Sequence, residues 1–99
     1  MLYMVLDTEN LEKTKEILRE RRIVMNMTQQ EASRRSGVNI STLRHFEQSG
    51  EISYLNLLKL LSLYGMAQRV MEAMEDRSSW TLEQLERGET RKRARCRKV

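Results

Sequence analysis

The sequence predicts an all-α protein built from several short helices. Two observations support this class. The chain has 99 residues, no proline and only four glycines, which suits helices joined by short turns. Aromatic residues make up 5% of the chain and β-branched runs are sparse, so an extensive sheet is not expected. The length predicts one domain with a modest core.

The first six residues, MLYMVL, are predicted to form a short strand or an extended arm. Leu2, Met4 and Leu6 alternate with residues that are also partly apolar, so the segment needs cover on both sides. The apolar run is too short for a membrane span, and no basic residue precedes it as in a signal peptide.

A first helix is predicted from a cap at Asp7, Thr8 or Asn10 to about Met25, with Asn26 closing it in the left-handed conformation. Its inner face is predicted to carry Leu11, Thr14, Ile17, Leu18 and Met25.

Residues 28–50, TQQEASRRSGVNISTLRHFEQSG, predict two short helices joined by a tight turn. Thr28 and Glu31 have the spacing of a capping box at the start of the first. Gly37 stands where the chain leaves that helix with a positive φ, and Asn39 is a good N-cap for the second.

These two helices are predicted to cover about 28–36 and 39–48. On the second, Val38, Leu43 and Phe46 fall on one side. The opposite side mostly carries Ile40, Ser41, Arg44 and His45.

Two further helices follow. Ser53 is predicted to cap a helix that ends at Gly65 and whose apolar block is Leu57, Leu58, Leu60 and Leu61. The next has a methionine-rich face made by Met66, Val70, Met71 and Met74.

The chain is predicted to divide into three regions. Residues 1–75 contain the helix-turn-helix formed by residues 28–50, residues 76–89 contain a short helix, and residues 90–99 form a basic tail. The short helix carries Trp80, Leu82 and Leu85, starts at Ser79 or Thr81, and stops at Gly88. The tail, TRKRARCRKV, has no apolar periodicity and is predicted to be disordered.

The net charge of +4 is unevenly divided. Residues 13–46 carry eight bases and three acids, and residues 90–99 carry six bases and no acid. Residues 1–12 carry three acids and no base, and residues 66–89 carry three bases and six acids. Positive charge therefore coincides with the helix-turn-helix, which is typical of nucleic-acid binding.

An enzyme is not indicated. The chain has no phosphate-binding glycine loop, one histidine and one cysteine, so no cofactor, metal or disulfide framework is expected. The lone Cys96 fits a reducing, cytoplasmic location. An RNA-binding adaptor stays an alternative, because positive charge does not distinguish DNA from RNA, but the chain lacks the stacking aromatics expected on a basic RNA-binding face.

The spacing resembles the lambda-repressor-like, Cro-type (XRE) helix-turn-helix family. The matching residues are Thr28, Gln29, Glu31, Gly37, Val38, Ser41, Thr42, Leu43, Phe46 and Glu47. The likeness extends back to Leu18 and forward through the LLKLL run at 57–61. Where the family usually has leucine and then alanine after Glu31, this chain has Ala32 and Ser33. The resemblance implies five compact helices, the second helix of the motif lying in the DNA major groove.

The resemblance also implies which residues meet DNA. Arg44 is expected to read a base, because a guanidinium grips guanine O6 and N7 together; the alternatives are a phosphate clamp or a surface ion pair. Gln29 is expected to bond a phosphate and to brace a side chain of the second helix. The other candidates of the motif are Thr28, Asn39, Ile40, Ser41, Thr42 and His45. Arg22, Arg34 and Arg35 are generic phosphate candidates, the alternative being surface arginines that aid solubility.

The tail arginines are possible additional DNA contacts, on phosphates or in a minor groove. They are Arg91, Arg93, Arg95 and Arg97. The alternatives are an acidic partner or a frayed, solubilising end.

Two functions follow as expectations. The first is a sequence-specific repressor of double-stranded DNA that acts as a homodimer on a two-fold operator. The second is an antitoxin that represses its own operon and binds a kinase-like toxin, because FEQSGEIS before a leucine-rich helix is similar to HipB-like antitoxins. The remaining alternative is a stand-alone XRE-type regulator without a toxin partner.

Overall fold

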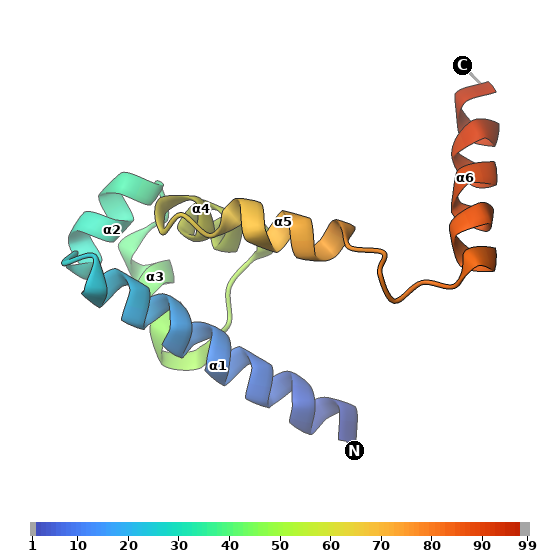
Figure 1. The fold of residues 1–99 in the computed structure, drawn as a ribbon. Helices are drawn as coiled ribbons and strands as arrows, with labels where there is room; N and C mark the ends of the chain where they lie inside the picture. The colour runs from blue at the N-terminus through green and yellow to red at the C-terminus, as the bar shows by residue number, and fades with distance from the viewer. Residues whose placement is uncertain (1, 98–99) are drawn as a thin grey trace.

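The computed structural model describes residues 2–97, with side chains described for residues 6–92. This part of the chain contains helices and no strand, so the predicted all-α class is confirmed (Figure 1). The helices are α1 (Leu2–Val24), α2 (Gln29–Ser36), α3 (Ile40–Ser49), α4 (Tyr54–Leu63), α5 (Ala67–Glu75) and α6 (Leu82–Arg97). No helix in this range has both the length and the apolar character needed to cross a membrane.

One core joins α1 to α4. Helix α1 packs on α3, α2 packs on both α3 and α4, and α5 follows against α4. The buried apolar residues are Leu18, Met27, Ala32, Val38, Leu43, Phe46, Leu60, Leu61 and Tyr64. Burial of each large apolar side chain among them stabilises the fold by about 1.5–3 kcal/mol.

The predicted helix starts and stops are largely confirmed. The Thr28 hydroxyl accepts a hydrogen bond from the Glu31 N–H at 3.1 Å, and the Asn39 side chain accepts from the Ser41 N–H at 2.8 Å. Ser53 caps α4 in the same way, accepting from the Asn56 N–H at 3.2 Å. These caps satisfy backbone donors that a helix start leaves without partners.

Left-handed residues end the first three helices, at Asn26 and Gly37 as expected and also at Gly50. Asn26 has φ 59°, and both Gly37 and Gly50 have φ 81°. At Gly50 the backbone also approaches α1: a Cβ there would lie 2.7 Å from the carbonyl oxygen of Leu11. Gly50 is therefore required for close packing as well as for its conformation.

The expected N-terminal arm is wrong, because α1 already begins at Leu2. Asp7, Thr8 and Asn10 consequently lie inside the helix and do not cap it. Residues 1–25 contain neither proline nor glycine, and leucine, methionine and glutamate have good helix propensity. Alternation over six residues is too short a pattern to outweigh them.

The expected inner face of α1 is wrong in most positions. Of the five residues predicted there, only Leu18 is buried, whereas Ile17 is 52% and Met25 is 42% exposed. The buried line instead joins Leu18 to Arg22, four residues further on. Packing against α3 selects this line, which contains an arginine that apolar periodicity cannot reveal.

The expected stop at Gly88 and the expected disorder after residue 90 are wrong for the described residues, since α6 continues to Arg97. The predicted cap at Thr81 is confirmed, because its hydroxyl and N–H both pair with Gln84. An i,i+4 ion pair between Glu83 and Arg87 at 2.8 Å adds support. One glycine costs a helix about 1 kcal/mol, which these helix-forming neighbours offset. Residues 98–99 lie outside the described residues.

Helix α6 stands apart from the other five (Figure 1). The radius of gyration is 17.7 Å, against about 13 Å for a compact domain of 100 residues. The ion pairs and side-chain hydrogen bonds described for α6 join it to itself or to the loop before it.

Candidate nucleic-acid interface

Helix α3 has a buried face and an exposed polar face, as predicted. Leu43 and Phe46 are at most 1% exposed and anchor the inner side in the core. The outer side exposes Ser41, Arg44 and His45 to solvent. Ile40 and Thr42, at its margins, are half-buried. Helix α3 can therefore present three hydrogen-bonding side chains to a flat or grooved partner.

The turn between α2 and α3 is fixed by small polar side chains. The Ser33 hydroxyl donates to the Val38 carbonyl at 2.5 Å, and the Ser36 hydroxyl accepts from the Val38 N–H at 3.1 Å. Ala32, next to Ser33, is fully buried. The departure from the usual leucine and alanine thus gives a small core residue and an extra hydrogen bond across the turn.

A buried ion pair joins α1 to α3. The Arg22 Nε donates to Glu47 Oε2 at 2.8 Å, and its Nη2 donates to Glu47 Oε1 at 2.9 Å. The two side chains are only 11% and 5% exposed. The Arg22 Nη1 also donates to the Met27 carbonyl at 2.9 Å. Two parallel hydrogen bonds fix the relative orientation of the two helices more firmly than a single contact.

Gln29 adds a third helix to this network. Its Nε2 donates to Glu47 Oε1 at 3.0 Å, so the expectation that it braces a side chain of the second motif helix is confirmed. The hydrogen bond with Glu47 raises the pKa of Arg22 despite the opposing effect of burial. Glu47 thus receives donors from α1 and α2 and holds α3 in place against both.

Tyr64 lies in the core near this network. It is 1% exposed, and its hydroxyl has no hydrogen-bond partner among the described residues. Burial, together with the nearby negative charge of Glu47, raises the pKa of Tyr64 to about 12. Its hydroxyl therefore stays protonated in the folded protein at all ordinary pH values.

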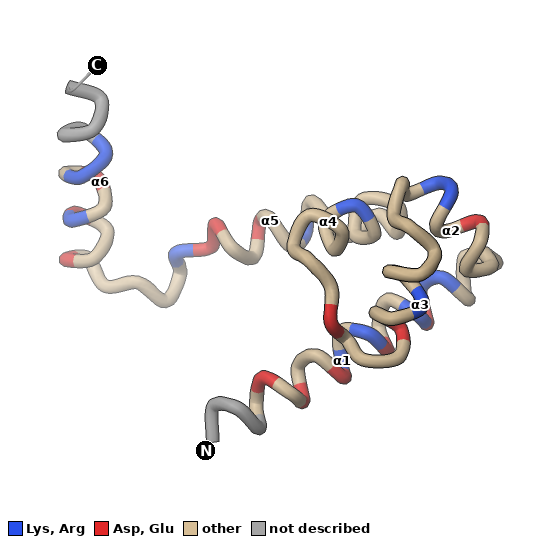
Figure 2. Tube along the Cα trace, turned by 180° about the vertical axis from the view of Figure 1, so that it is seen from behind, with Lys and Arg blue, Asp and Glu red and all other residues tan. Residues whose placement is uncertain are grey.

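Exposed basic residues lie on both α2 and α3. Arg34 and Arg35 on α2 are both exposed, and the Arg35 Nη1 lies 3.8 Å from the Met27 sulfur. The His45 Nε2 lies 3.7 Å from a carboxylate oxygen of Glu51, with both side chains largely exposed. Figure 2 shows acidic positions spaced along the first half of α1. Single acidic residues also belong to α2, to α3 and to the turn after α3, namely Glu31, Glu47 and Glu51.

Most predicted DNA contacts belong to the two motif helices or their caps, but Arg22 lies on α1. Thr28, Gln29, Asn39 and the α3 residues lie on the two motif helices or at their starts. Arg22, by contrast, is 9% exposed, and its donors point to Glu47 and Met27. A positioning role for Arg22 explains this placement better than a phosphate contact.

The tail residues are not brought to α3. Helix α6 lies at the opposite end of the molecule from α2 in both views, and Arg91 on it is exposed (Figures 1 and 2). The side chains of Arg93, Arg95 and Arg97 lie outside the described residues.

Glu47 is the functional residue that sequence reasoning missed, although it belongs to the motif. The available signal was an acid beside the buried Phe46 in an otherwise basic stretch. A buried acid needs a cation, but the sequence shows neither that Glu47 is buried nor which arginine pairs with it.

Comparison with known proteins agrees with this geometry. Residues 18–67 match the model of a helix-turn-helix family of the Cro/C1 (XRE) type. The match covers half of the chain and contains α2, α3 and the braces around Glu47, so the protein belongs to this family of DNA-binding transcriptional regulators. Neither the curated proteins nor the solved structures gave a match.

Proposed function

We propose that this protein is a sequence-specific repressor that binds double-stranded DNA as a homodimer. Each α3 would enter the major groove of one half-site, the two half-sites lying about one helical turn apart. The observation that carries the proposal is the exposed polar face of α3, held rigidly by the contacts of Glu47 with Arg22 and Gln29.

The roles of the side chains follow from their chemistry and placement. Arg44, in the middle of the exposed face, suits bidentate recognition of guanine. Ser41 and His45 offer hydrogen bonds to bases or phosphates, and the half-buried Ile40 offers apolar contact with a thymine methyl group. The remaining surface residues of the motif suit phosphate contacts: Thr28, Gln29, Asn39, Thr42, Arg34 and Arg35.

Electrophoretic mobility shift tests the proposal. DNA from upstream of the protein's own reading frame is compared with a shuffled duplex of equal length at moderate salt, since low salt favours non-sequence-specific binding. Tighter binding to the upstream DNA is expected. Equal affinity for the two duplexes would contradict a sequence-specific repressor, and stronger binding to single-stranded RNA would point to an adaptor instead.

A two-fold operator and a dimer belong to the same proposal. Closed two-fold assemblies are the commonest oligomers, and one such dimer presents two identical recognition helices to two half-sites. Repression of the protein's own operon in the cytoplasm is the simplest use of such binding. Footprinting of the upstream DNA should show two protected segments related by inverted sequence.

The antitoxin function is a second candidate with a narrower basis. The run FEQSGEIS, which carries this likeness, forms the end of α3 and the turn towards α4. A kinase-like toxin would then bind a surface away from the DNA-reading face. Co-purification with the product of the neighbouring reading frame tests this, and absence of a stable complex would leave a stand-alone XRE-type regulator.

A further inference from the structure

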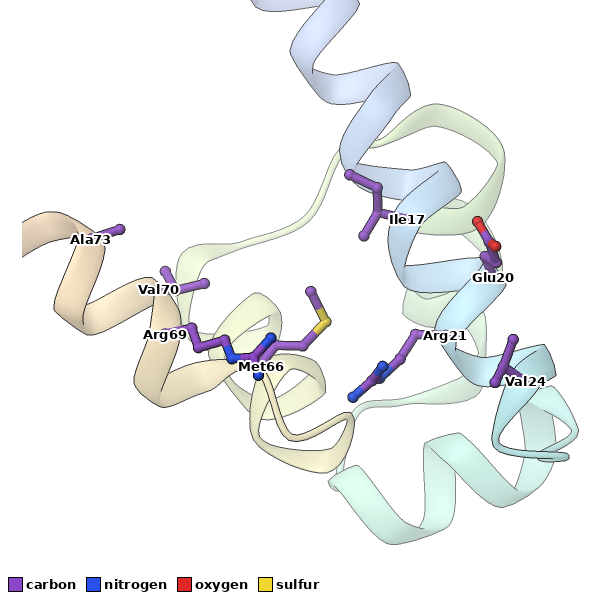
Figure 3. Close-up of a pocket in the computed structure, with 8 residues that line it drawn as sticks. All are labelled: Ile17, Glu20, Arg21, Val24, Met66, Arg69, Val70 and Ala73. Atoms are coloured by element: carbon purple, nitrogen blue, oxygen red, sulfur yellow. The ribbon is translucent and has the colours of Figure 1, made fainter.

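An apolar groove lies between α1 and α5, on residues that the proposed DNA contacts do not use. It has a volume of about 400 Å³. Its apolar lining comes from Ile17 and Val24 of α1, from Met66 just before α5, and from Val70 and Ala73 of α5 (Figure 3). Ile17 is 52% and Val24 71% exposed, so water meets a largely apolar surface here.

Helix α6 and the loop before it carry an apolar face that is equally uncovered. Trp80 is 45% and Leu82 is 72% exposed, and Leu85 lies one turn after Leu82. Most helices in proteins are stabilised by packing such a face rather than by intrinsic propensity. The same chain thus contains an open apolar groove and an unpacked helix with a short apolar face at its start.

The charges of the two surfaces are complementary. Arg21 and Arg69 line the groove with a single acid, Glu20. The first half of α6, residues 82–89, carries three glutamates and one arginine, and that arginine is already paired with Glu83. The second half of α6 is basic, so only the first half, lying in the groove, would bring net negative charge to the net positive charge at the rim.

The loop before α6 favours docking on a second molecule over docking on its own. Arg77 lies over the Trp80 ring at 5.4 Å and pairs with Glu89 at 3.9 Å. The Asp76 carboxylate accepts from the Ser78 N–H at 2.9 Å. The first and last of these contacts tighten the loop, and the pair with Glu89 ties Arg77 to α6, which leaves less chain to reverse direction at the end of α5. Helix α6 is instead held away from its own groove (Figure 1).

We propose that α6 of one molecule docks in the α1–α5 groove of a second copy, and that the exchange is reciprocal. Trp80, Leu82 and Leu85 would fill the groove, and the α6 glutamates would lie near Arg21 and Arg69. Such exchange of an identical element gives a closed two-fold dimer at low cost. The inference rests on the proposed function for its purpose, since a dimer presents two α3 helices to one operator.

Trp80 reports this docking directly, because it is the only tryptophan of the chain. Its fluorescence and the sedimentation of the full-length protein are measured over the same dilution series, without DNA. The emission should shift to shorter wavelength as the protein concentration rises, in step with a mass twice 11.8 kDa. A shift that is independent of concentration would mean docking within one chain and would overturn the exchange.

Matched substitutions to glutamate test each surface. Ala73→Glu places an acid in the groove and should weaken dimerisation at least about tenfold, which corresponds to 1.4 kcal/mol. Met74→Glu is its control, because the neighbouring Met74 is 57% exposed and does not line the groove. On α6, Leu85→Glu should have the same effect, whereas Gln84→Glu keeps the cap on Thr81 and should not.

The outcomes separate this inference from the proposed function. Equal dimerisation of Ala73→Glu and Met74→Glu would overturn the groove as the interface. Ala73→Glu should also keep its affinity for a single half-site, since it does not touch α3. If docking is observed but neither the operator nor a half-site is bound, the exchange stands and the repressor proposal fails.

Discussion

Arg22 of α1 and Glu47 of α3 form a bidentate, buried ion pair, with donor–acceptor distances of 2.8 and 2.9 Å. The pair connects the helix that precedes the motif to the helix proposed to read DNA. Gln29 completes the connection through its own hydrogen bond to Glu47. The orientation of α3 therefore depends on Arg22 and Glu47, whose side chains face inward.

Removing one partner of this pair should be costly. Arg22→Met is expected to lower the free energy of unfolding by about 3 kcal/mol, because it leaves the Glu47 carboxylate buried without its cation. Urea unfolding followed by circular dichroism measures this. The double variant Arg22→Met/Glu47→Leu should recover most of the loss, as buried apolar pairs replace ion pairs well.

The exposed ion pair between Lys15 and Glu12 is the control for that experiment, at 3.0 Å with Glu12 50% exposed. Glu12→Ala should change stability by less than about 1 kcal/mol. Equal losses for Glu12→Ala and Arg22→Met would contradict the special role of burial.

Tyr64 should make the protein sensitive to alkali. Its pKa is about 12 when folded, against 10.0 ordinarily, so between these values the unfolded chain loses a proton that the folded chain keeps. The contribution of Tyr64 is thus fully present below pH 10 and is lost as pH rises towards 12, by at most about 2.7 kcal/mol in total, because each pKa unit corresponds to about 1.4 kcal/mol. Denaturant unfolding at pH 9 and pH 11 measures the loss.

Tyr64→Phe should reduce the loss of stability at high pH. At pH 7 the substitution should leave the free energy of unfolding unchanged or raise it by up to about 1 kcal/mol. It removes a buried hydroxyl that has no partner among the described residues. A marked destabilisation by Tyr64→Phe at pH 7 would show that the hydroxyl is hydrogen-bonded after all.

Gly50 and Gly37 share φ 81° but should differ in their tolerance of alanine. Gly37→Ala has nothing within 4 Å of the new Cβ and should cost about 1 kcal/mol for the left-handed conformation alone. At Gly50 the new Cβ would meet the Leu11 backbone, so a cost of about 3 kcal/mol is expected. Thermal unfolding of both variants decides this, and equal midpoints would argue against the close approach of α1.

Arg44→Ala should relax specificity at one base pair of each half-site, by about 1–3 kcal/mol. Binding to a set of operators with single base changes measures this. The control is Lys59→Ala, an exposed residue of α4 that belongs to no proposed contact. If Arg44→Ala weakened all operator variants equally, the side chain would be a phosphate clamp and not a base reader.

If the tail contacts DNA, it should contribute equally to the binding of every DNA sequence. Replacing Arg91 and Lys92 together by alanine is expected to weaken operator and random DNA alike, and to reduce the salt dependence of log K by about 2. Affinities at several salt concentrations provide the slope. An unchanged slope would place the tail elsewhere, on an acidic partner or free in solvent.

The sequence alone determined the helix-turn-helix. Thr28, Gly37, Asn39 and Gly50 act through local backbone geometry, so their residue types predict where α2 and α3 begin and end. The spacing of Leu43 and Phe46 likewise predicts which face of α3 is buried. These features depend on neighbours within a few positions, which the sequence displays directly.

Tertiary structure decided what depends on distant residues. Arg22 and Glu47 are 25 positions apart, so only packing of α1 on α3 shows that they neutralise each other and that Arg22 faces inward. The same packing turned Ile17 from an expected core residue into the wall of an open groove. Several faces of α1 have similar apolar content, and contacts with the other helices determine which of them is buried. That outcome depends on all residues of the core together.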